Sequence, residues 1–143
     1  QKNIGPAGLT VVIVRRDLAP WNILVRDSDK SVMLTDFEMS KLFDGSPTVA
    51  GKWLDNPYRA PEICSDVMPD ARADVYSWAR VFVHAATGQL PDFGQEATLL
   101  EQTDLHDTIR AAVLRSLAPL DARPRTIDEV LDALNCWNTI AMN

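Results

Sequence analysis

The spacing of apolar residues changes partway along the chain, and this change constrains the fold more than any other feature. From Asp74 to Thr87 the apolar residues recur every three or four positions, as on one helix face, and Gly88 follows where helices commonly end. Residues 105–117 and 126–137 show similar spacing, and the second segment opens with the capping-box pattern TIDE. The second half is therefore predicted to contain three helices.

The first third carries short β-branched and aliphatic runs instead. Residues 10–14, 22–25 and 32–37 are predicted to be short strands, and we expect the first two to be buried. The segment 43–69 is rich in Gly, Pro, Ser and Asp and is predicted to be a long ordered loop. The expected fold is mainly α with short β-strands, in the α+β class.

Length and charge narrow the class of protein. The chain has 143 residues, of which 46% are hydrophobic, and this length suits one domain. Its formal charge of −6 argues against a sequence-independent nucleic-acid binder, which needs basic surface. No apolar stretch is long enough to span a membrane, and the N-terminus lacks a signal-peptide pattern. We expect a soluble, cytoplasmic protein.

A polar loop between two predicted strands carries the residues with the clearest chemistry. Asp17 is followed five positions later by Asn22, and Asp36 lies at the end of the next predicted strand. Phosphoryl transfer needs a carboxylate for the attacking hydroxyl and oxygen ligands for Mg²⁺, and these three side chains supply both. Their order and spacing are the evidence, because Asp and Asn are common in loops for local backbone reasons.

At these residues the chain resembles the C-terminal lobe of a eukaryotic-type (Hanks-type) protein kinase. Five family motifs occur in the correct order. They are RRDLAPWN at 15–22 for the catalytic loop, TDFE at 35–38 for the metal-binding motif, YRAPE at 58–62, DVYSWA at 74–79 and DARP at 121–124. The resemblance covers about residues 9–137, and it implies a kinase-like C-lobe domain over residues 1–143.

The resemblance implies a role for each matched residue. Asp17 would accept the proton of the substrate hydroxyl, while Asn22 and Asp36 would hold Mg²⁺ against the ATP phosphates. Arg16 would pair with a phosphate on Thr48 or Ser46 in the activation segment.

Three further residues would have structural roles. Glu62 and Arg123 would form a buried ion pair that fixes the end of the activation segment. Asp74, as the first residue of the central helix, would hold the backbone of the catalytic loop through charge-assisted hydrogen bonds.

Several positions depart from the family pattern and keep alternatives open. Arg15 replaces the usual His, Ala19 replaces the Lys of serine/threonine kinases, and Glu38 replaces the glycine of D-F-G. No Gly-rich loop, strand Lys or helix Glu of an N-terminal lobe occurs in the chain, so we expect a fragment without that lobe. One alternative is a pseudokinase that binds partners without turnover. Another is a small-molecule phosphotransferase of the aminoglycoside or choline kinase type, which the D-F-E reading at Glu38 favours.

We interpret the chain as part of a protein kinase that uses ATP and Mg²⁺ to phosphorylate a protein substrate. Pro20 and the DARADVYS phrasing at 70–77 favour serine/threonine over tyrosine specificity.

Overall fold

The computed structural model describes residues 18–35, 56–64 and 70–141, and the elements named below lie in these ranges. In chain order they are η1 (Pro20–Asn22), β1 (Ile23–Val25), β2 (Val32–Leu34), η3 (Pro61–Cys64), α2 (Ala71–Thr87), α3 (Glu96–Glu101), α4 (Asp107–Ser116) and α5 (Ile127–Ala141). The described part is mainly helical with one antiparallel two-stranded sheet, so the predicted fold class is confirmed. The predicted strand at 10–14 lies outside the described residues.

Helix α2 is the centre of the structure, and local residues determine both of its ends. The Asp70 side chain accepts a hydrogen bond of 2.9 Å from the Arg72 backbone N–H and so caps the first turn. The helix therefore begins at Ala71, and the expectation that Asp74 is its first residue is wrong. It ends as predicted at Gly88, whose φ of 70° is the left-handed conformation that favours glycine.

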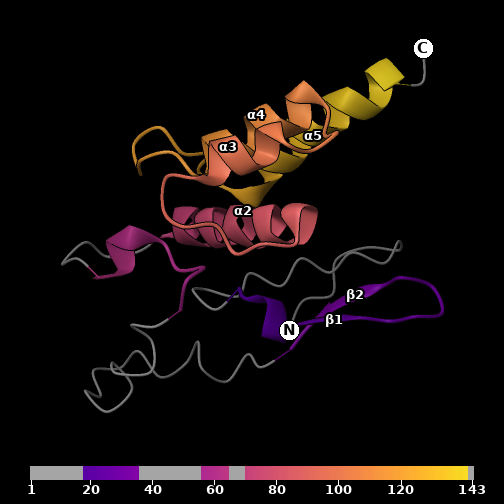
Figure 1. Ribbon diagram of the computed structural model, residues 1–143, viewed down its shortest axis with the longest axis horizontal. Coiled ribbons are helices and arrows are strands. Elements are labelled where there is room, and N and C mark those ends of the chain that lie inside the picture. Colours follow the sequence, from indigo (N-terminus) through magenta and orange to yellow (C-terminus); the bar gives the residue numbers. More distant parts are fainter. Residues whose placement is uncertain (1–17, 36–55, 65–69, 142–143) are drawn as a thin grey trace.

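The apolar face of α2 packs against the three later helices. Ala79 and Val83 of α2 form a fully buried cluster with Leu100 of α3 and Val113 of α4. Figure 1 shows α3, α4 and α5 together on one side of α2, with η1 and the β1–β2 hairpin on the other side. Helix α2 thus lies between helices α3 to α5 and the segment that carries the predicted catalytic loop.

The later helices differ slightly from their predicted bounds. α4 begins at Asp107 rather than at position 105, because the His106 ring accepts a hydrogen bond from the Thr108 backbone N–H and caps the helix. α5 begins at Ile127, where Thr126 Oγ1 accepts from the Glu129 backbone N–H at 3.4 Å. α5 also continues past position 137 to its end at residue 141.

Besides η1, which lies in the predicted polar loop, two more short helices lie in segments for which no helix was predicted. α3 has six residues, too few for its apolar spacing to stand out in the sequence. η3 forms part of the segment 43–69 that was predicted to be loop, and residues 43–55 and 65–69 of that segment lie outside the described residues.

The β1–β2 hairpin corrects one expectation about burial. Ile23 pairs with Leu34 and Val25 with Val32, so the predicted strands are present at these positions. The side chains of Leu24, Val25, Val32 and Met33 are exposed, however, so β1 is not a buried strand. A two-stranded ribbon has no neighbouring strand, and helices α2 to α5 pack against one another instead of on the ribbon (Figure 1).

Candidate active site

The described residues contain four of the eight predicted site residues. These four are Asn22, Glu62, Asp74 and Arg123. The other four, Arg16, Asp17, Asp36 and Thr48, lie outside the described residues. The roles of all eight in catalysis, metal binding or regulation remain predictions.

Asn22 is held where the predicted catalytic loop meets the hairpin. Pro20 begins the 3₁₀ turn η1, where its fixed φ and missing N–H are tolerated, and the Asn22 backbone N–H donates to Ala19 O at 3.0 Å. This turn leaves Asn22 only 5% exposed, although it belongs to a loop-like sequence. Burial of a polar side chain lowers the free energy of unfolding unless the side chain is hydrogen bonded.

The hairpin brings Asn22 next to the end of β2. The Thr35 backbone N–H donates to Asn22 O at 2.8 Å, and Thr35 Oγ1 lies 3.5 Å from the same oxygen. Thr35 directly precedes Asp36 in the sequence. Two motif segments that are thirteen residues apart in the chain therefore meet through a backbone hydrogen bond.

Glu62 and Arg123 form the ion pair that the resemblance implied. Arg123 Nη1 lies 2.5 Å from Glu62 Oε1 and Nη2 lies 3.3 Å from Oε2, and the two side chains are 2% and 10% exposed. Arg123 also donates to the backbone oxygens of Arg72 and Ala118, and its guanidinium lies 4.7 Å from the centre of the Tyr76 ring. This one side chain connects η3, α2 and the segment before α5.

Asp74 lies in the first turn of α2 and is partly buried. A carboxylate near a helix N-terminus is stabilised by the helix dipole. The expected hydrogen bonds from the catalytic loop to Asp74 stay a prediction.

An aromatic cluster that we did not predict lies beside the candidate site. The Tyr58 hydroxyl is 2.6 Å from His84 Nδ1, their rings stack with centroids 5.9 Å apart, and the Trp21 ring meets Tyr58 edge-on at 5.6 Å. Burial raises the pKa of Tyr58, and the nearby charge of Arg80 partly opposes this rise. The sequence could place His84 on one stripe of α2 with Tyr76 and Arg80, at four-residue spacing, but this spacing gives no signal for the contact with Tyr58 or Trp21.

Arg80 forms a second buried ion pair that the sequence did not suggest. Its Nη1 lies 2.6 Å from Glu96 Oε1, and the two side chains are 1% and 10% exposed. Arg80 also donates to the backbone oxygens of Pro57 and Pro91, while Glu96 Oε2 accepts from the Gly94 backbone N–H. The bond to Pro57 holds the residue before Tyr58 against α2.

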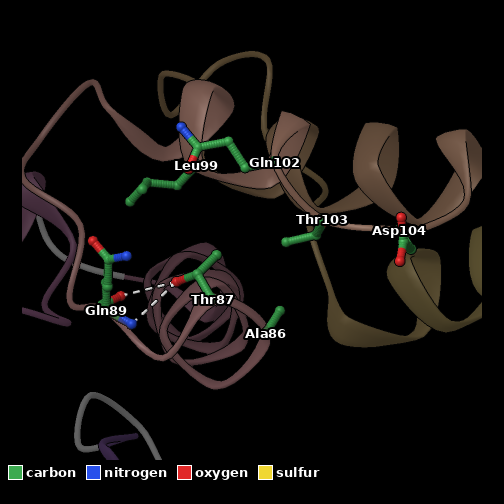
Figure 2. Close-up of a pocket in the computed structure, with 7 residues that line it drawn as sticks. All are labelled: Ala86, Thr87, Gln89, Leu99, Gln102, Thr103 and Asp104. Carbon is green, nitrogen blue, oxygen red and sulfur yellow. Dashed lines mark hydrogen bonds between the residues drawn. The ribbon is translucent and has the colours of Figure 1, made fainter.

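A pocket of about 330 Å³ lies away from these residues (Figure 2). It lies between the C-terminal end of α2 and the α3–α4 segment and has mainly polar walls, including Thr87, Gln89 and Asp104. The Thr87 hydroxyl is already bonded to backbone oxygens of Val83 and Gln89. None of the predicted site residues lines this pocket, so we place the candidate site at Asn22 and the hairpin.

Within 18–35, 56–64 and 70–141, no group of three or more His, Cys, Asp or Glu side chains is arranged to hold a metal ion. Among the same residues, no helix is both long and apolar enough to cross a membrane.

Comparison with known proteins identifies the family. The protein kinase domain model matches residues 10–139, which is most of the chain, and the chain therefore belongs to the protein kinase family. No solved structure matches it significantly.

Three curated relatives illustrate the range of the similarity. The leucine-rich repeat receptor-like protein kinase TDR of Arabidopsis thaliana is 33% identical over 96 residues, which are 63% of this chain and 9% of the relative. The serine/threonine-protein kinase AtPK1/AtPK6 of the same plant is 35% identical over 98 residues, 68% of this chain and 21% of the relative. A probable serine/threonine-protein kinase of Clostridium acetobutylicum is 37% identical over 81 residues, 55% of this chain and 12% of the relative. The match thus spans about a fifth or less of each relative's length.

Proposed function

We propose that this chain is the C-terminal part of a serine/threonine protein kinase domain, which transfers the terminal phosphoryl group of ATP to hydroxyl groups of protein substrates. The observation that best supports this proposal is the hydrogen bond from Thr35 N–H to Asn22 O. It holds the residue before Asp36 against Asn22, as two residues that share a metal ion would require. The serine/threonine kinase names of several relatives support the same substrate class.

The proposed metal site consists of Asn22 and Asp36. An amide oxygen and a carboxylate are hard oxygen ligands of the kind that Mg²⁺ prefers, so this donor set fits the ion. Bound Mg²⁺ would neutralise charge on the ATP phosphates during transfer. The rigid placement of Asn22 in η1, with 5% exposure, means that little ordering would be needed when the ion binds.

Asp17 is the proposed base for the substrate hydroxyl. It directly precedes Leu18, the first residue of the described segment that leads into η1. Arg16 is proposed to pair with phosphorylated Thr48, which would couple the activation segment to the catalytic loop.

The remaining parts of an ATP site would come from a longer protein. The family uses a Gly-rich loop, a strand Lys and a helix Glu for the nucleotide, and these motifs are not among residues 1–143. The relatives are several times longer than the matched region, which supports a fragment.

The test is a phosphoryl-transfer assay on the longest chain that contains these residues. Wild-type protein is incubated with Mg²⁺-ATP and a mixture of Ser- and Thr-containing peptides, and Asp17→Asn is compared with Asp27→Asn. Asp27 is an exposed hairpin-turn residue and serves as the matched control. We expect Asp17→Asn to lower the rate by about 10²–10⁴-fold, the usual contribution of a general base, and Asp27→Asn to have no effect.

The other possible outcomes would contradict the assigned base or favour a different function. Transfer that survives Asp17→Asn would refute the assigned base. Phosphorylation of an aminoglycoside or choline in place of peptides would favour the small-molecule phosphotransferase, which Glu38 suggests. Binding of Mg²⁺-ATP without transfer would favour a pseudokinase, which Ala19 and Arg15 suggest. Calorimetry on Asp36→Asn tests the metal role, because the fold should persist while Mg²⁺-dependent nucleotide binding is lost.

A further inference from the structure

The pocket between α2 and the α3–α4 segment lies outside the proposed kinase site, and the proposed function does not involve it. Ala86 and Thr87, in the last turn of α2, form one wall. Leu99 of α3 and Thr103 lie across the pocket from them (Figure 2). Its volume of about 330 Å³ is at the small end of the range of about 300–1,000 Å³ for ligand sites. The pocket therefore suits a small molecule or a single side chain.

The hydroxyl groups of the walls can accept hydrogen bonds from a ligand, but their protons are already used. The Thr87 hydroxyl lies 2.8 Å from Val83 O and 3.1 Å from Gln89 O, so its one proton is donated within the protein whichever oxygen accepts it. The Thr103 hydroxyl donates to Leu100 O at 2.6 Å. A hydroxyl oxygen has two lone pairs, of which the Gln89 backbone N–H uses at most one at Thr87. Both hydroxyl oxygens therefore favour a ligand that carries N–H donors.

The other polar groups of the pocket add further acceptors. Asp104 contributes an exposed carboxylate, which only accepts hydrogen bonds when it is ionised. Among the described residues, no basic side chain forms an ion pair with Asp104. Gln89 and Gln102 contribute side-chain amides, each of which can turn its oxygen toward a donor. The walls thus offer many acceptors and no fixed donor.

The charge around the pocket is negative. Residues 81–109, which include every wall of the pocket, contain five Asp or Glu residues and no Lys or Arg. The flanking arginines, Arg80 and Arg110, are each paired with a carboxylate. Although Arg110 Nη2 lies 3.5 Å from Thr103 O, Arg110 does not line the pocket. Helix α2 adds to the negative charge, because the last carbonyl groups of a helix carry partial negative charge and α2 ends at the pocket.

An organic cation fits this combination better than a metal ion does. A guanidinium group carries five N–H donors and an ammonium group carries three, and neither accepts a hydrogen bond. Their methylene groups can lie against Leu99 and Ala86, the apolar part of the walls. Mg²⁺ and Ca²⁺ need several oxygen ligands in a closed arrangement, and the pocket has one carboxylate.

We propose that this pocket binds a guanidinium or alkylammonium group, with Asp104 as its ionic partner and the amide and hydroxyl oxygens of the walls as further acceptors. The group belongs either to a free organic cation or to an Arg or Lys side chain of a partner protein, and the chemistry of recognition is the same for both. This inference goes beyond the proposed kinase function and does not depend on it.

The test is an NMR titration of the ¹⁵N-labelled chain with butylguanidinium and with butylurea, which has nearly the same shape but no charge. The amide signals of Gln89, Gln102 and Thr103 report binding in the pocket. We expect butylguanidinium to bind in the millimolar range and butylurea to bind about five-fold more weakly, the upper end for an ion pair at a surface. This difference should shrink as the ionic strength rises from about 0.01 M to about 1 M, because the Debye length falls from about 30 Å to about 3 Å.

Three variants locate the site, and far-UV circular dichroism checks that each is folded. Asp104→Asn should weaken the binding of butylguanidinium about five-fold and leave that of butylurea unchanged. Glu101→Gln is the matched control, because it removes the same charge from an exposed residue that does not line the pocket, and it should change either affinity by less than about two-fold. Ala86→Leu fills the pocket from an exposed position of α2 and should abolish the binding of both ligands without changing the charge.

A tripeptide with a central Arg, compared with its neutral citrulline counterpart, distinguishes the two sources of the cation. Tighter binding of the Arg peptide than of butylguanidinium, lost in Asp104→Asn, would identify a partner's side chain, whereas equal or weaker binding would identify a free cation. Both results support the site. Equal affinities for butylguanidinium and butylurea, an affinity unchanged by Asp104→Asn, or shifts confined to residues outside the pocket would overturn it. No binding of either cation at about 0.1 M would overturn it as well.

Discussion

Removal of the Glu62 charge should destabilise the fold markedly, because it leaves the charge of Arg123 buried without its carboxylate. Arg123 is 2% exposed and has no access to water that could replace Glu62. Breaking a buried pair by removal of one partner typically costs about 3–5 kcal/mol. In Glu62→Gln the amide oxygen still accepts one hydrogen bond, and the carbonyls of Arg72 and Ala118 still accept from Arg123. We therefore expect a loss near the lower limit, about 3 kcal/mol in the free energy of unfolding.

The loss can be measured by urea unfolding at pH 7, followed by far-UV circular dichroism. A loss of this size is a large share of the roughly 5–15 kcal/mol that stabilise a typical domain. Asp107→Asn is the matched control, because its ion pair with Arg110 has a similar distance of 2.9 Å but an aspartate side chain that is 90% exposed. The control should cost less than about 1 kcal/mol.

A double-mutant cycle with Arg123→Met isolates the interaction between the two side chains. The double variant should be more stable than the sum of the two single losses predicts, by about 2 kcal/mol, because it leaves no buried guanidinium unpaired. Additive losses, or a loss below about 0.5 kcal/mol for Glu62→Gln alone, would refute the view that the pair joins η3 to the helical core.

Three further predictions concern the other determinants of the fold. Arg80→Met should cost about 3 kcal/mol in the same urea assay, because it leaves the carboxylate of Glu96 buried, and a change below about 1 kcal/mol would contradict this. Gly88→Ala should cost about 1 kcal/mol and lower the thermal midpoint, because alanine is strained at the φ of 70°. An added Cβ would meet no atom within 4 Å, so this backbone strain is the whole of the expected cost. An unchanged midpoint would argue against that strain. Asp70→Ala should cost about 1 kcal/mol at pH 7 through loss of the cap. Because hydrogen bonds from Arg72 lower the pKa of Asp70 below its ordinary value of 3.8, this stabilisation is complete above that value and is lost as the pH falls through the lowered pKa. A gap between wild type and Asp70→Ala that did not narrow at all as the pH was lowered below 3.8 would contradict this.

The helices were largely predictable because their signals are local. The spacing of apolar residues located α2, α4 and α5, and the glycine at position 88 marked the end of α2. The start of α2 was missed by three residues because its cap, Asp70, precedes the apolar stripe that marked the helix. Helix α3 was missed because six residues cannot establish a helical period.

The candidate site was predictable only in part. The resemblance implied the pair of Glu62 and Arg123, and the structure brings the two side chains together across 61 positions of the chain, while the role of Asn22 stays a prediction. The spacing could not reveal the Arg80–Glu96 pair or the Tyr58–His84 bond, because each joins residues on different elements whose approach depends on packing. Periodicity could suggest that Tyr76, Arg80 and His84 share a stripe of α2, but not what that stripe faces.

The sequence by itself determined the three long helices, where α2 ends and to which family the chain belongs, since these depend on spacing and on short motifs. The tertiary structure alone decided which side chains are buried. It left β1 and β2 exposed although both are apolar, because the helices pack on one another and the ribbon lies outside their core. It also buried Arg80 beside Glu96, and it placed Trp21 against Tyr58. Burial and long-range contact depend on how whole elements pack together, and no local stretch of sequence specifies that packing.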